Sequence, residues 1–340
     1  MRPTLSDVAK LAGVSVATAS RALSNPDLVA DGTRRAVRDA ANSCGYKINL
    51  VARSLRIQRT NTLLLLVPCI DNPFYPAVVR SVEETALSAG YSIIVGFTSK
   101  TERHREAYGD LMSAGRVDGL LVADGGTGVD QITGGRPDLP VVQMLEPIFG
   151  PPAPIVRVDD RLIGELAVRH LSSMGHRRIA HISGAPNSIS AAERQAGFVS
   201  AMTRSGLTVD DGLIKCGHSR RDEAADAMKQ LLALANPPTA VFCASDTMAC
   251  AAMDVCRDRG IHVPGDISFV GADNTADGQF AFPAVSTVDV PRADIGARAA
   301  EKLIGMIRGQ MDIAQDTVLP VELRRRASCA PVRGAAVAAA

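Results

Sequence analysis

A short stretch near the N-terminus carries small polar side chains and one arginine at a spacing suited to reading DNA bases. Gly13 separates two segments of helical pattern, and Ser15 stands where the second helix would begin. Glycine permits a turn with positive φ, and a serine hydroxyl accepts a free N–H of the first helical turn. The outward positions of the second helix, where a recognition helix meets the major groove, are Val16, Ala17, Ser20 and Arg21. The alternative is an ordinary helical hairpin of small residues.

A basic run follows this head. Val51 and Leu55 are four residues apart within 50–56 and share one helical face. Seven residues are too few for a stable isolated helix, so the run should order only against a partner. Its flanking Arg53, Arg56 and Arg59 point to a polyanion. A solvated basic linker is the alternative.

Polar side chains gather just after predicted strands in the rest of the chain. Carboxylates with an arginine suit a hydroxyl-rich ligand, because ionised oxygens accept hydroxyl protons and a guanidinium donates in a fixed fork. Helix capping is the alternative for each of them, and it is favoured for Asp246. The candidates are Asp71, Asn72, Phe74, Tyr75, Asp124, Asp159, Ser188, Ser190, Arg194, Ser245, Asp246, Asp273 and Asn274.

Three helices should position the first set of residues. The first covers about 6–12 with Val8, Ala9 and Ala12 inward, and the second buries Val14, Ala19 and Leu23. Asp31 is predicted to cap a third helix that ends near Gly45.

Alternating strands and helices should position the second set. Strands are predicted at 62–67, 92–97, 119–123 and 141–144, at 156–159 where the chain crosses between lobes, and at 178–182, 213–215, 240–243 and 267–272. Helices are predicted at 73–89 and 102–114, then after the strand 156–159 up to residue 174, and at 191–205, 222–235 and 247–259. Apolar strands alternating with helices indicate parallel sheets covered on both faces. Two such series predict two doubly wound lobes, with a ligand between them at the carboxyl ends of strands.

Charge and composition support this division. Residues 1–59 hold ten Lys and Arg against four Asp and Glu, whereas the whole chain has a net charge of +1. A basic end on a near-neutral chain is typical of a DNA module joined to another domain.

The apolar run Leu63–Val67 is far too short for a membrane span, and the N-terminus lacks a signal-peptide core. Seven cysteines without a Cys-x-x-Cys pair fit reduced thiols. We expect a cytoplasmic protein without metal or other cofactor.

The chain resembles the LacI/GalR family of bacterial transcription repressors up to about residue 328. The stretches that carry the resemblance are Val8-Ala9, Gly13-Val14-Ser15, Thr18, Ser20-Arg21, Ala52-Arg53-Ser54-Leu55, Asn72-Pro73-Phe74, Val117-Asp118-Gly119, Gly175-His176-Arg177-Arg178-Ile179, Val263-Pro264, Asp266-Ile267-Ser268, Pro283 and Ser286-Thr287-Val288. The resemblance implies a helix-turn-helix head (1–46), a hinge helix and linker (47–60), a two-lobed periplasmic-binding-protein-like core (61–330) and a disordered tail (331–340). The first lobe would comprise about 61–159 plus 291–320, and the second about 160–288 plus 321–330.

The resemblance also implies residue roles. Val16, Ala17 and Arg21 match positions that read base edges, and Leu55 matches a wedge that enters the minor groove and kinks the duplex. Positions that hold phosphates are matched by Thr4, Ser15, Asn25 and Thr33. The DNA-binding set is completed by Thr18, Ser20, Asn49, Ala52 and Arg53. Asp159, Arg194 and Asp273 match effector contacts, for which ligand contact is favoured over capping, and Phe74 and Tyr75 match aromatic positions beside the ligand.

Within the family, the stretches 237–249 and 273–280 resemble the nucleoside-responsive branch, which includes cytidine-responsive repressors. Three positions depart from the pattern: Ser219 replaces an aromatic, Ile48 replaces the usual proline before the hinge, and the Ala-rich end from Gly334 has no heptad for tetramerisation.

The sequence therefore predicts a dimeric repressor of palindromic operator DNA, controlled by a nucleoside, pentose or hexose. A periplasmic sugar-binding protein would share the lobes but not the basic head. An enzyme would need a phosphate loop or an activated nucleophile, and the segment Gly125-Gly126-Thr127-Gly128 has no following lysine.

Overall fold

A computed structural model describes residues 3–24, 28–46, 59–98, 102–125, 136, 138–147, 153–310 and 315–332. The chain divides into two compact units, a head over 1–60 and a core over 61–340. The hinge at 47–58 and the last eight residues lie outside the described part, so the boundaries proposed for the hinge helix and the tail remain predictions. Among the described residues, no helix combines the length and the apolar character that a membrane span needs.

Three helices form the head: α1 (Leu5–Leu11), α2 (Val16–Ser24) and α3 (Asp31–Cys44). Gly13 adopts a φ of 65° in the turn between α1 and α2, and Gly45 closes α3 with a φ of 68°. Small residues let the helices pack closely, since their buried side chains are Val8, Ala9, Ala19, Ala22, Val37, Ala40 and Ala41. The predicted helices and their inward faces are therefore confirmed within about one residue.

The prediction that Asp31 caps the third helix is wrong. Ala30 occupies the cap position without a side-chain hydrogen bond, and Asp31 is the first residue of the helix. Its carboxylate instead lies 2.6 Å from the guanidinium of Arg34. A negative charge in the first turn also complements the helix dipole.

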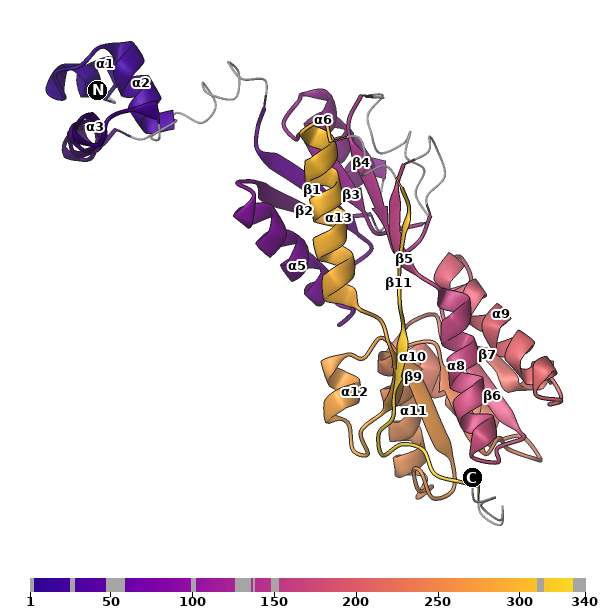
Figure 1. The fold of residues 1–340 in the computed structure, drawn as a ribbon. Coiled ribbons are helices and arrows are strands. Elements are labelled where there is room, and N and C mark those ends of the chain that lie inside the picture. The colour runs from indigo at the N-terminus through magenta and orange to yellow at the C-terminus, as the bar shows by residue number, and fades with distance from the viewer. Residues whose placement is uncertain are drawn as a thin grey trace. The chain divides into compact units, whose positions relative to one another are not determined.

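The first half of the core is a six-stranded sheet in the order β11-β5-β4-β3-β1-β2, in which all pairings are parallel (Figure 1). Its strands are β1 (Thr62–Val67), β2 (Ser92–Phe97), β3 (Gly119–Val122), β4 (Val141–Met144), β5 (Ile155–Val158) and β11 (Thr317–Leu319). The helices of this half are α5 (Tyr75–Ser88), α6 (Glu102–Ser113) and α13 (Arg292–Ile307). Leu63, Leu65 and Val67 pack in the cluster under α5 and α13, whereas Leu64 and Leu66 pack on the opposite face beside Met112 of α6. The unbroken apolar run of β1 thus reflects a strand covered on both faces.

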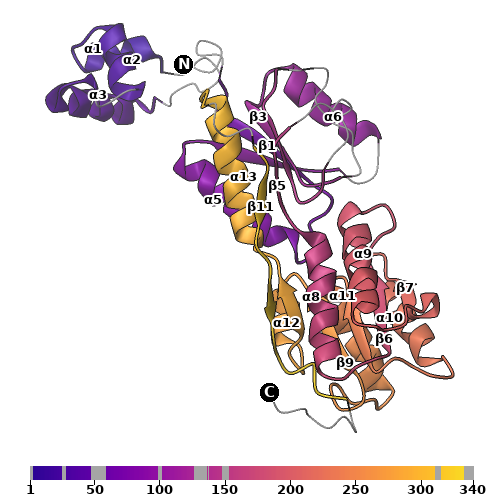
Figure 2. The same cartoon turned by 45° about the vertical axis from the view of Figure 1, so that its right-hand side comes forward.

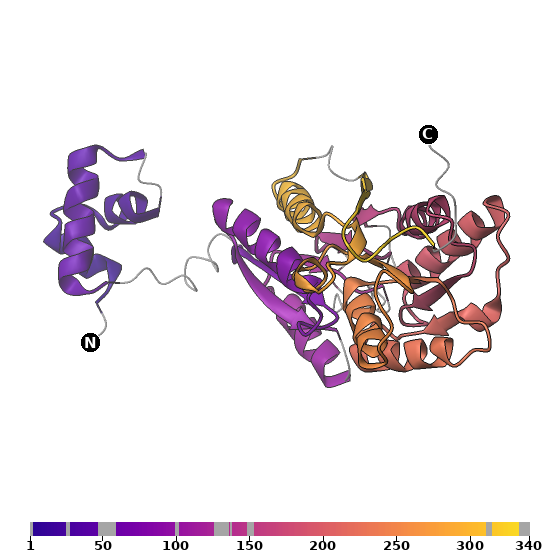
Figure 3. The same ribbon diagram turned by 90° about the horizontal axis from the view of Figure 1, so that it is seen from below.

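A second six-stranded sheet has the order β12-β10-β9-β8-β6-β7. Its strands are β6 (Ile179–Ser183), β7 (Ile214–Cys216), β8 (Ala240–Cys243), β9 (Ser268–Ala272), β10 (Ser286–Asp289) and β12 (Glu322–Arg324). The helices of this half, drawn from pink to orange in Figure 3, are α8 (Asp160–Ser173), α9 (Ile189–Arg204), α10 (Arg221–Leu232), α11 (Asp246–Asp258) and α12 (Ala276–Phe280). The two predicted doubly wound lobes are confirmed, except that β12 pairs with β10 in the antiparallel sense.

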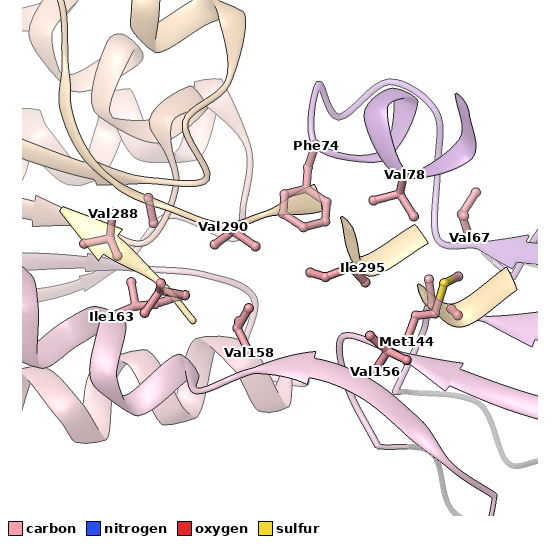
Figure 4. Close-up of a cluster of buried hydrophobic side chains, with 14 of the residues drawn as sticks. Val67, Phe74, Val78, Met144, Val156, Val158, Ile163, Val288, Val290 and Ile295 are labelled. Atoms are coloured by element: carbon pink, nitrogen blue, oxygen red, sulfur yellow. The ribbon is translucent and has the colours of Figure 1, made fainter. Parts of the chain in front are cut away.

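The chain passes between the two sheets three times: from β5 to α8, from β10 to α13, and from β11 to β12. Apolar side chains continue through these passages. Val158 and Val290, one beside each of the first two crossings, belong to the same buried cluster as Val67 of β1 and Val288 of β10 (Figure 4). One hydrophobic cluster therefore continues through both halves of the core.

Candidate DNA interface and effector site

Caps fix the first two helices of the head. The Thr4 hydroxyl accepts the backbone N–H of Asp7 at 3.4 Å, and the Asp7 carboxylate accepts the backbone N–H of Thr4 at 2.9 Å. The Asp7 carboxylate also accepts the Thr4 hydroxyl at 2.7 Å, and this hydrogen bond, followed by the one from the Thr4 N–H, lowers the pKa of Asp7. The Ser15 hydroxyl accepts the N–H of Thr18 at 3.0 Å, which confirms the predicted cap of α2. The Ser15 cap fixes where α2 begins and therefore which of its residues lie on the outer face.

The outer face of α2 carries the predicted base-reading residues. Val16 is 48% exposed, and Ala17 and Arg21 are also exposed. Thr18, Ser20 and Thr33 are half-buried. The predicted contacts Asn25, Asn49, Ala52, Arg53 and Leu55 lie outside the described residues. The described part of the head therefore presents a short basic and apolar surface with Arg21 on it.

The core contains a buried ion cluster centred on Arg194 of α9. Its Nε donates to Asp160 at 2.8 Å, and one terminal nitrogen donates to Asp273 at 3.1 Å and to the carbonyl of Ala244 at 2.6 Å. We call Arg194, Asp160 and Asp273 the Arg194 cluster; all three side chains are buried. Burial acts to lower the pKa of Arg194, but the two carboxylates outweigh it and raise the pKa. Arg194 is therefore paired with two carboxylates inside the core.

A close helix crossing brings Arg194 to Asp160. A Cβ on Gly164 of α8 would lie 2.1 Å from the carbonyl oxygen of Arg194, and a Cβ on Gly197 of α9 would lie 1.9 Å from that of Arg161. Figure 2 shows α8 and α9 side by side. Only residues without a side chain allow the two backbones to approach so closely. This close approach brings the Arg194 side chain within hydrogen-bond distance of Asp160.

Asp273 lies in a turn with strained backbone angles. Asp273 follows β9 with a φ of 99°, and Asn274 follows with a φ of 54°. Residues other than glycine rarely adopt such angles, and they concentrate at functional sites. Asp273 is 4% exposed, and its burial raises its pKa although Arg194 acts in the opposite direction. The turn after β9 is therefore held by its surroundings.

A carboxylate from the first half binds the start of α9. Glu146, just after β4, accepts the Ser188 hydroxyl at 2.5 Å, the N–H of Ile189 at 3.2 Å and the N–H of Ser190 at 3.1 Å. The N-terminus of a helix favours a negative charge, because its first N–H groups have no partner within the helix. Glu146 therefore links the two halves at the carboxyl edges of their sheets.

Aromatic rings lie beside these groups. Phe74 and Tyr75 meet edge to face with their ring centres 5.3 Å apart, and the guanidinium carbon of Arg292 lies 5.9 Å from the Phe74 ring centre. Arg292 also donates to the carbonyl oxygens of Pro73 at 3.2 Å and Asn274 at 2.8 Å. The pKa of Tyr75 is raised, first by burial and then by the charges of Cys69, Glu146, Asp124 and Asp273. Asp124, which follows a strand of the first sheet, and Asp273, which follows a strand of the second, thus both act on the Tyr75 hydroxyl.

Other predicted site residues serve as caps. Asp159 caps α8 by accepting the N–H of Leu162 at 3.0 Å, and Ser245 caps α11 by accepting that of Met248 at 3.3 Å. Asp246, for which capping was favoured, is instead the fully buried first residue of α11, so that prediction is wrong. The Thr98 hydroxyl donates to Asp124, and Asp71 is exposed. Effector contact by Asp71, Asp124, Asp159 and Ser245 stays a prediction.

Three residues of the site were missed from the sequence: Asp160, Glu146 and Arg292. Glu146 and Arg292 each follow a strand within three residues, so the rule that found Asp124 and Asp273 would have found them too. Asp160 follows directly on Asp159, and only the cap made by Asp159 shows which of the two turns inward. The described residues contain no group of three or more His, Cys, Asp or Glu side chains arranged to hold a metal ion.

The chain was compared with known protein families and proteins. Residues 4–49 match the bacterial regulatory proteins of the lacI family, and residues 168–329 match the periplasmic binding protein-like domain. The transcriptional repressor CytR of Escherichia coli strain K12 is 35% identical over 327 residues, which cover 96% of each chain. The transcriptional regulator DegA of Bacillus subtilis strain 168 is 34% identical over 338 residues, 98% of this chain and 99% of DegA. The chain belongs to the LacI family.

Solved structures of the family agree with this fold. The lac repressor dimer bound to operator and the anti-inducer ONPF matches with a TM-score of 0.86 and 26% identity, over 97% of this chain and all of that one. The regulator CelR in complex with cellobiose matches with a TM-score of 0.73 and 31% identity, over 96% of this chain and all of that one. As a LacI-family member, the protein is a cytoplasmic, dimeric, DNA-binding transcription regulator with an effector-binding core, and its relatives are regulators rather than enzymes.

Proposed function

We propose that the protein represses transcription without catalysing a reaction, and that an uncharged, hydroxyl-rich effector bound at the Arg194 cluster sets its affinity for operator DNA. The observation that carries the proposal is the buried guanidinium of Arg194 between Asp160 and Asp273. Buried charges of this kind are costly unless they are paired. A sugar-type ligand would share their hydrogen-bonding capacity, because hydroxyl groups both donate and accept.

The charge balance favours a neutral ligand. Asp124, Glu146, Asp160 and Asp273 supply carboxylates, whereas Arg194 and Arg292 supply the positive charges. A phosphorylated or carboxylated effector would add further negative charge to this set, which like-charge repulsion disfavours.

A nucleoside and a simple sugar differ in the base, for which the described residues near the cluster offer the rings of Phe74 and Tyr75. Phe74 and Tyr75 lie beside the cluster, but Ser219 occupies the position where nucleoside-type relatives carry an aromatic. Its hydroxyl accepts the N–H of Ala185 at 3.3 Å. Without a second ring there, a base gains less from stacking, so pentoses and hexoses are placed beside nucleosides in the experiment.

The experiment is a binding screen of the full-length protein by thermal shift and calorimetry. The probes are cytidine, adenosine, ribose, glucose and cellobiose, with cytidine 5′-monophosphate and glucose 6-phosphate as charged counterparts. We expect at least one uncharged probe to bind and its phosphate to bind at least tenfold more weakly. Stronger binding of the phosphates would contradict the proposal.

The variant Arg194→Ala tests whether the effector binds at the Arg194 cluster. Removing the guanidinium leaves two buried carboxylates without their cation, so affinity for the probe found in the screen should fall by about 2–5 kcal/mol. The control is Arg204→Ala at the exposed end of the same helix, where Arg204 pairs with Glu165. Operator binding without effector should survive in both variants, because the head is a separate unit. Undiminished effector affinity in Arg194→Ala would contradict the assignment.

We also propose where the second copy of the dimer binds. Phe280 is 86% exposed and Phe282 is 97% exposed, beside a groove of about 720 Å³ that includes Met253 and Ile261. Adjacent exposed aromatic rings of this kind mark interaction surfaces. The occupant we propose is a second copy of this chain, since the related lac repressor is a dimer on its operator.

A further inference from the structure

Asp246 is a buried carboxylate that none of the roles above uses. It begins α11 and is 0% exposed. One oxygen, Oδ2, accepts the backbone N–H of Thr275 at 2.7 Å and the Thr275 hydroxyl at 3.3 Å. The other, Oδ1, has no hydrogen-bond partner among the described residues.

Two glycines leave room for this carboxylate. A Cβ on Gly271 of β9 would lie 2.3 Å from Oδ1, and a Cβ on Gly278 of α12 would lie 2.9 Å from Oδ2. Asp246 is therefore packed between the strand that leads into the strained turn at Asp273 and Asn274 and the short helix that leads out of it. Both partners of its Oδ2 belong to Thr275, the residue that ends this turn.

We propose that Asp246 is a positioning residue that holds the segment from Asp273 to Phe280, so that Asp273 faces Arg194, and that its hold depends on protonation. The inference rests on the proposed effector site only for what Asp273 would bind. How the segment is held can be measured without any ligand.

The physical basis of the proton dependence is burial. A buried carboxylate with one unpartnered oxygen is more stable as the neutral acid. Burial, followed by the charge of Asp273, raises the pKa of Asp246 to about 7. The Thr287 hydroxyl, the backbone N–H of Thr275 and the charge of Arg326 oppose this shift. The thiols of Cys243 and Cys250, whose own pKa values are raised by burial, also face Asp246.

The sign follows from linkage. When the segment opens, Asp246 meets water and its pKa returns to about 4. The closed form therefore binds a proton more tightly than the open form, so closing is most favourable below about pH 4. As the pH rises to about 7, the equilibrium constant for closing falls by at most tenfold per pH unit.

Hydrogen exchange followed by mass spectrometry tests this in the full-length protein between pH 4.5 and 8.5, after correction for intrinsic exchange. We expect protection of residues 274–282 to fall by up to tenfold per pH unit up to about pH 7 and then to level off. Peptides from α5 should not show this local slope. Asp246→Asn keeps an acceptor for Thr275 but cannot titrate, so protection should persist without the slope.

Asp246→Ala removes the acceptor, so protection of this segment at pH 6 should fall at least tenfold. Asp258→Asn, an exposed carboxylate at the far end of α11, is the matched control. If Asp246→Ala does not fold, Thr275→Val removes one donor and should weaken protection in the same peptides. Protection within twofold of wild type in both Asp246→Ala and Thr275→Val, a slope that persists in Asp246→Asn, or an equal loss in α5 would overturn the proposal.

Discussion

Arg21 projects from the exposed face of α2, and it makes no ion pair with any residue that the structure describes. Its neighbours on that face, Val16 and Ala17, offer only apolar contacts such as those to thymine methyl groups. A guanidinium can bond two acceptors of guanine at once. The base preference of the head should therefore depend on Arg21, which is the single charged residue of α2.

Arg21→Ala should weaken specific binding by roughly 1–3 kcal/mol and relax the preference at one base position in each half-site. The operator would first be selected from randomised DNA, and the variants would then be titrated against single-base changes of it. Arg38→Ala, an exposed arginine of α3, should keep the base preference. The same preference in Arg21→Ala would show that α2 does not read bases.

His181 illustrates how burial controls a charge. Its ring is fully buried and stacks against both Phe198 and Phe242, with ring centres 5.1 and 4.8 Å away. Nδ1 lies 3.0 Å from the carbonyl oxygen of Phe242, and Nε2 has no partner in the described part of the chain. Burial first, and the charge of Arg194 in addition, lower its pKa from 6.5 to about 4. The folded protein therefore keeps this imidazole neutral.

The unfolded chain binds a proton at His181 below about pH 6.5, whereas the folded chain does not bind it until about pH 4. Stability from this residue is therefore present above pH 6.5 and is lost by up to roughly 3 kcal/mol as the pH falls to 4. Because Asp246 acts in the opposite direction over this range, the measured quantity is the difference in free energy of unfolding between wild type and His181→Gln. That difference should change with pH.

The sequence predicted that Arg194 and Asp273 belong to one site, but it did not single out Asp160. Asp159 and Asp160 look equivalent in the sequence, and both follow a strand. Once Asp159 accepts the N–H of Leu162 as the cap, the next residue is rotated by about 100° around the helix and turns into the core. Which residue caps is decided by the packing of α8 on α9, and this packing joins segments more than thirty residues apart.

The crossing of α8 and α9 is the element that positions the cluster. At Gly197 a methyl group would meet the backbone of Arg161 rather than a flexible side chain, so relief requires the helices to move apart. Such a movement would lengthen the contact between Arg194 and Asp160.

Gly197→Ala should therefore destabilise the core by roughly 1–3 kcal/mol and weaken binding of the effector identified in the screen. Urea denaturation gives the first quantity and calorimetry the second. Gly32→Ala in α3 is the control, because nothing lies within 4 Å of its added Cβ. That change should leave the core unaffected and stabilise the head by about 0.5–1 kcal/mol. A Gly197→Ala core as stable as wild type would show that the helices are not held at this distance.

Long apolar strands and amphipathic helices were predictable as elements, because their periodicity is local. The antiparallel β12 and the five-residue α12 were not, and the predicted elements also omitted β10, β11 and the helix α13. β12 has three residues and is fixed by its pairing with β10, while α12 is held by Gly278 against Asp246. Both owe their form to contacts that are distant in sequence.

At the scale of the whole molecule, the proposed dimer surface depends on exposed aromatic rings. Each copy contributes one Phe282 ring to the proposed surface, and burying a ring of this size contributes about 1.5–3 kcal/mol. Since the symmetric interface repeats each contact, the effect counts twice per dimer.

Phe282→Ser should raise the dimer dissociation constant about 100-fold or more, as measured by sedimentation equilibrium. The fold of each copy should persist, because the ring is already 97% exposed. Val318→Thr, at a half-exposed position on the edge strand β11, should leave the dimer intact. An unchanged dissociation constant in Phe282→Ser would place the interface elsewhere.

The three passages between the sheets have a consequence for the gene. β11 completes the edge of one sheet and β12 the edge of the other, so the last part of the coding sequence serves both halves. Ser328, only a few codons further on, is fully buried and bonds both Ser286 and Phe269. A nonsense mutation shortly after α13 would thus remove an edge strand from each half at once. Late truncations of this gene should be as damaging to the core as early ones.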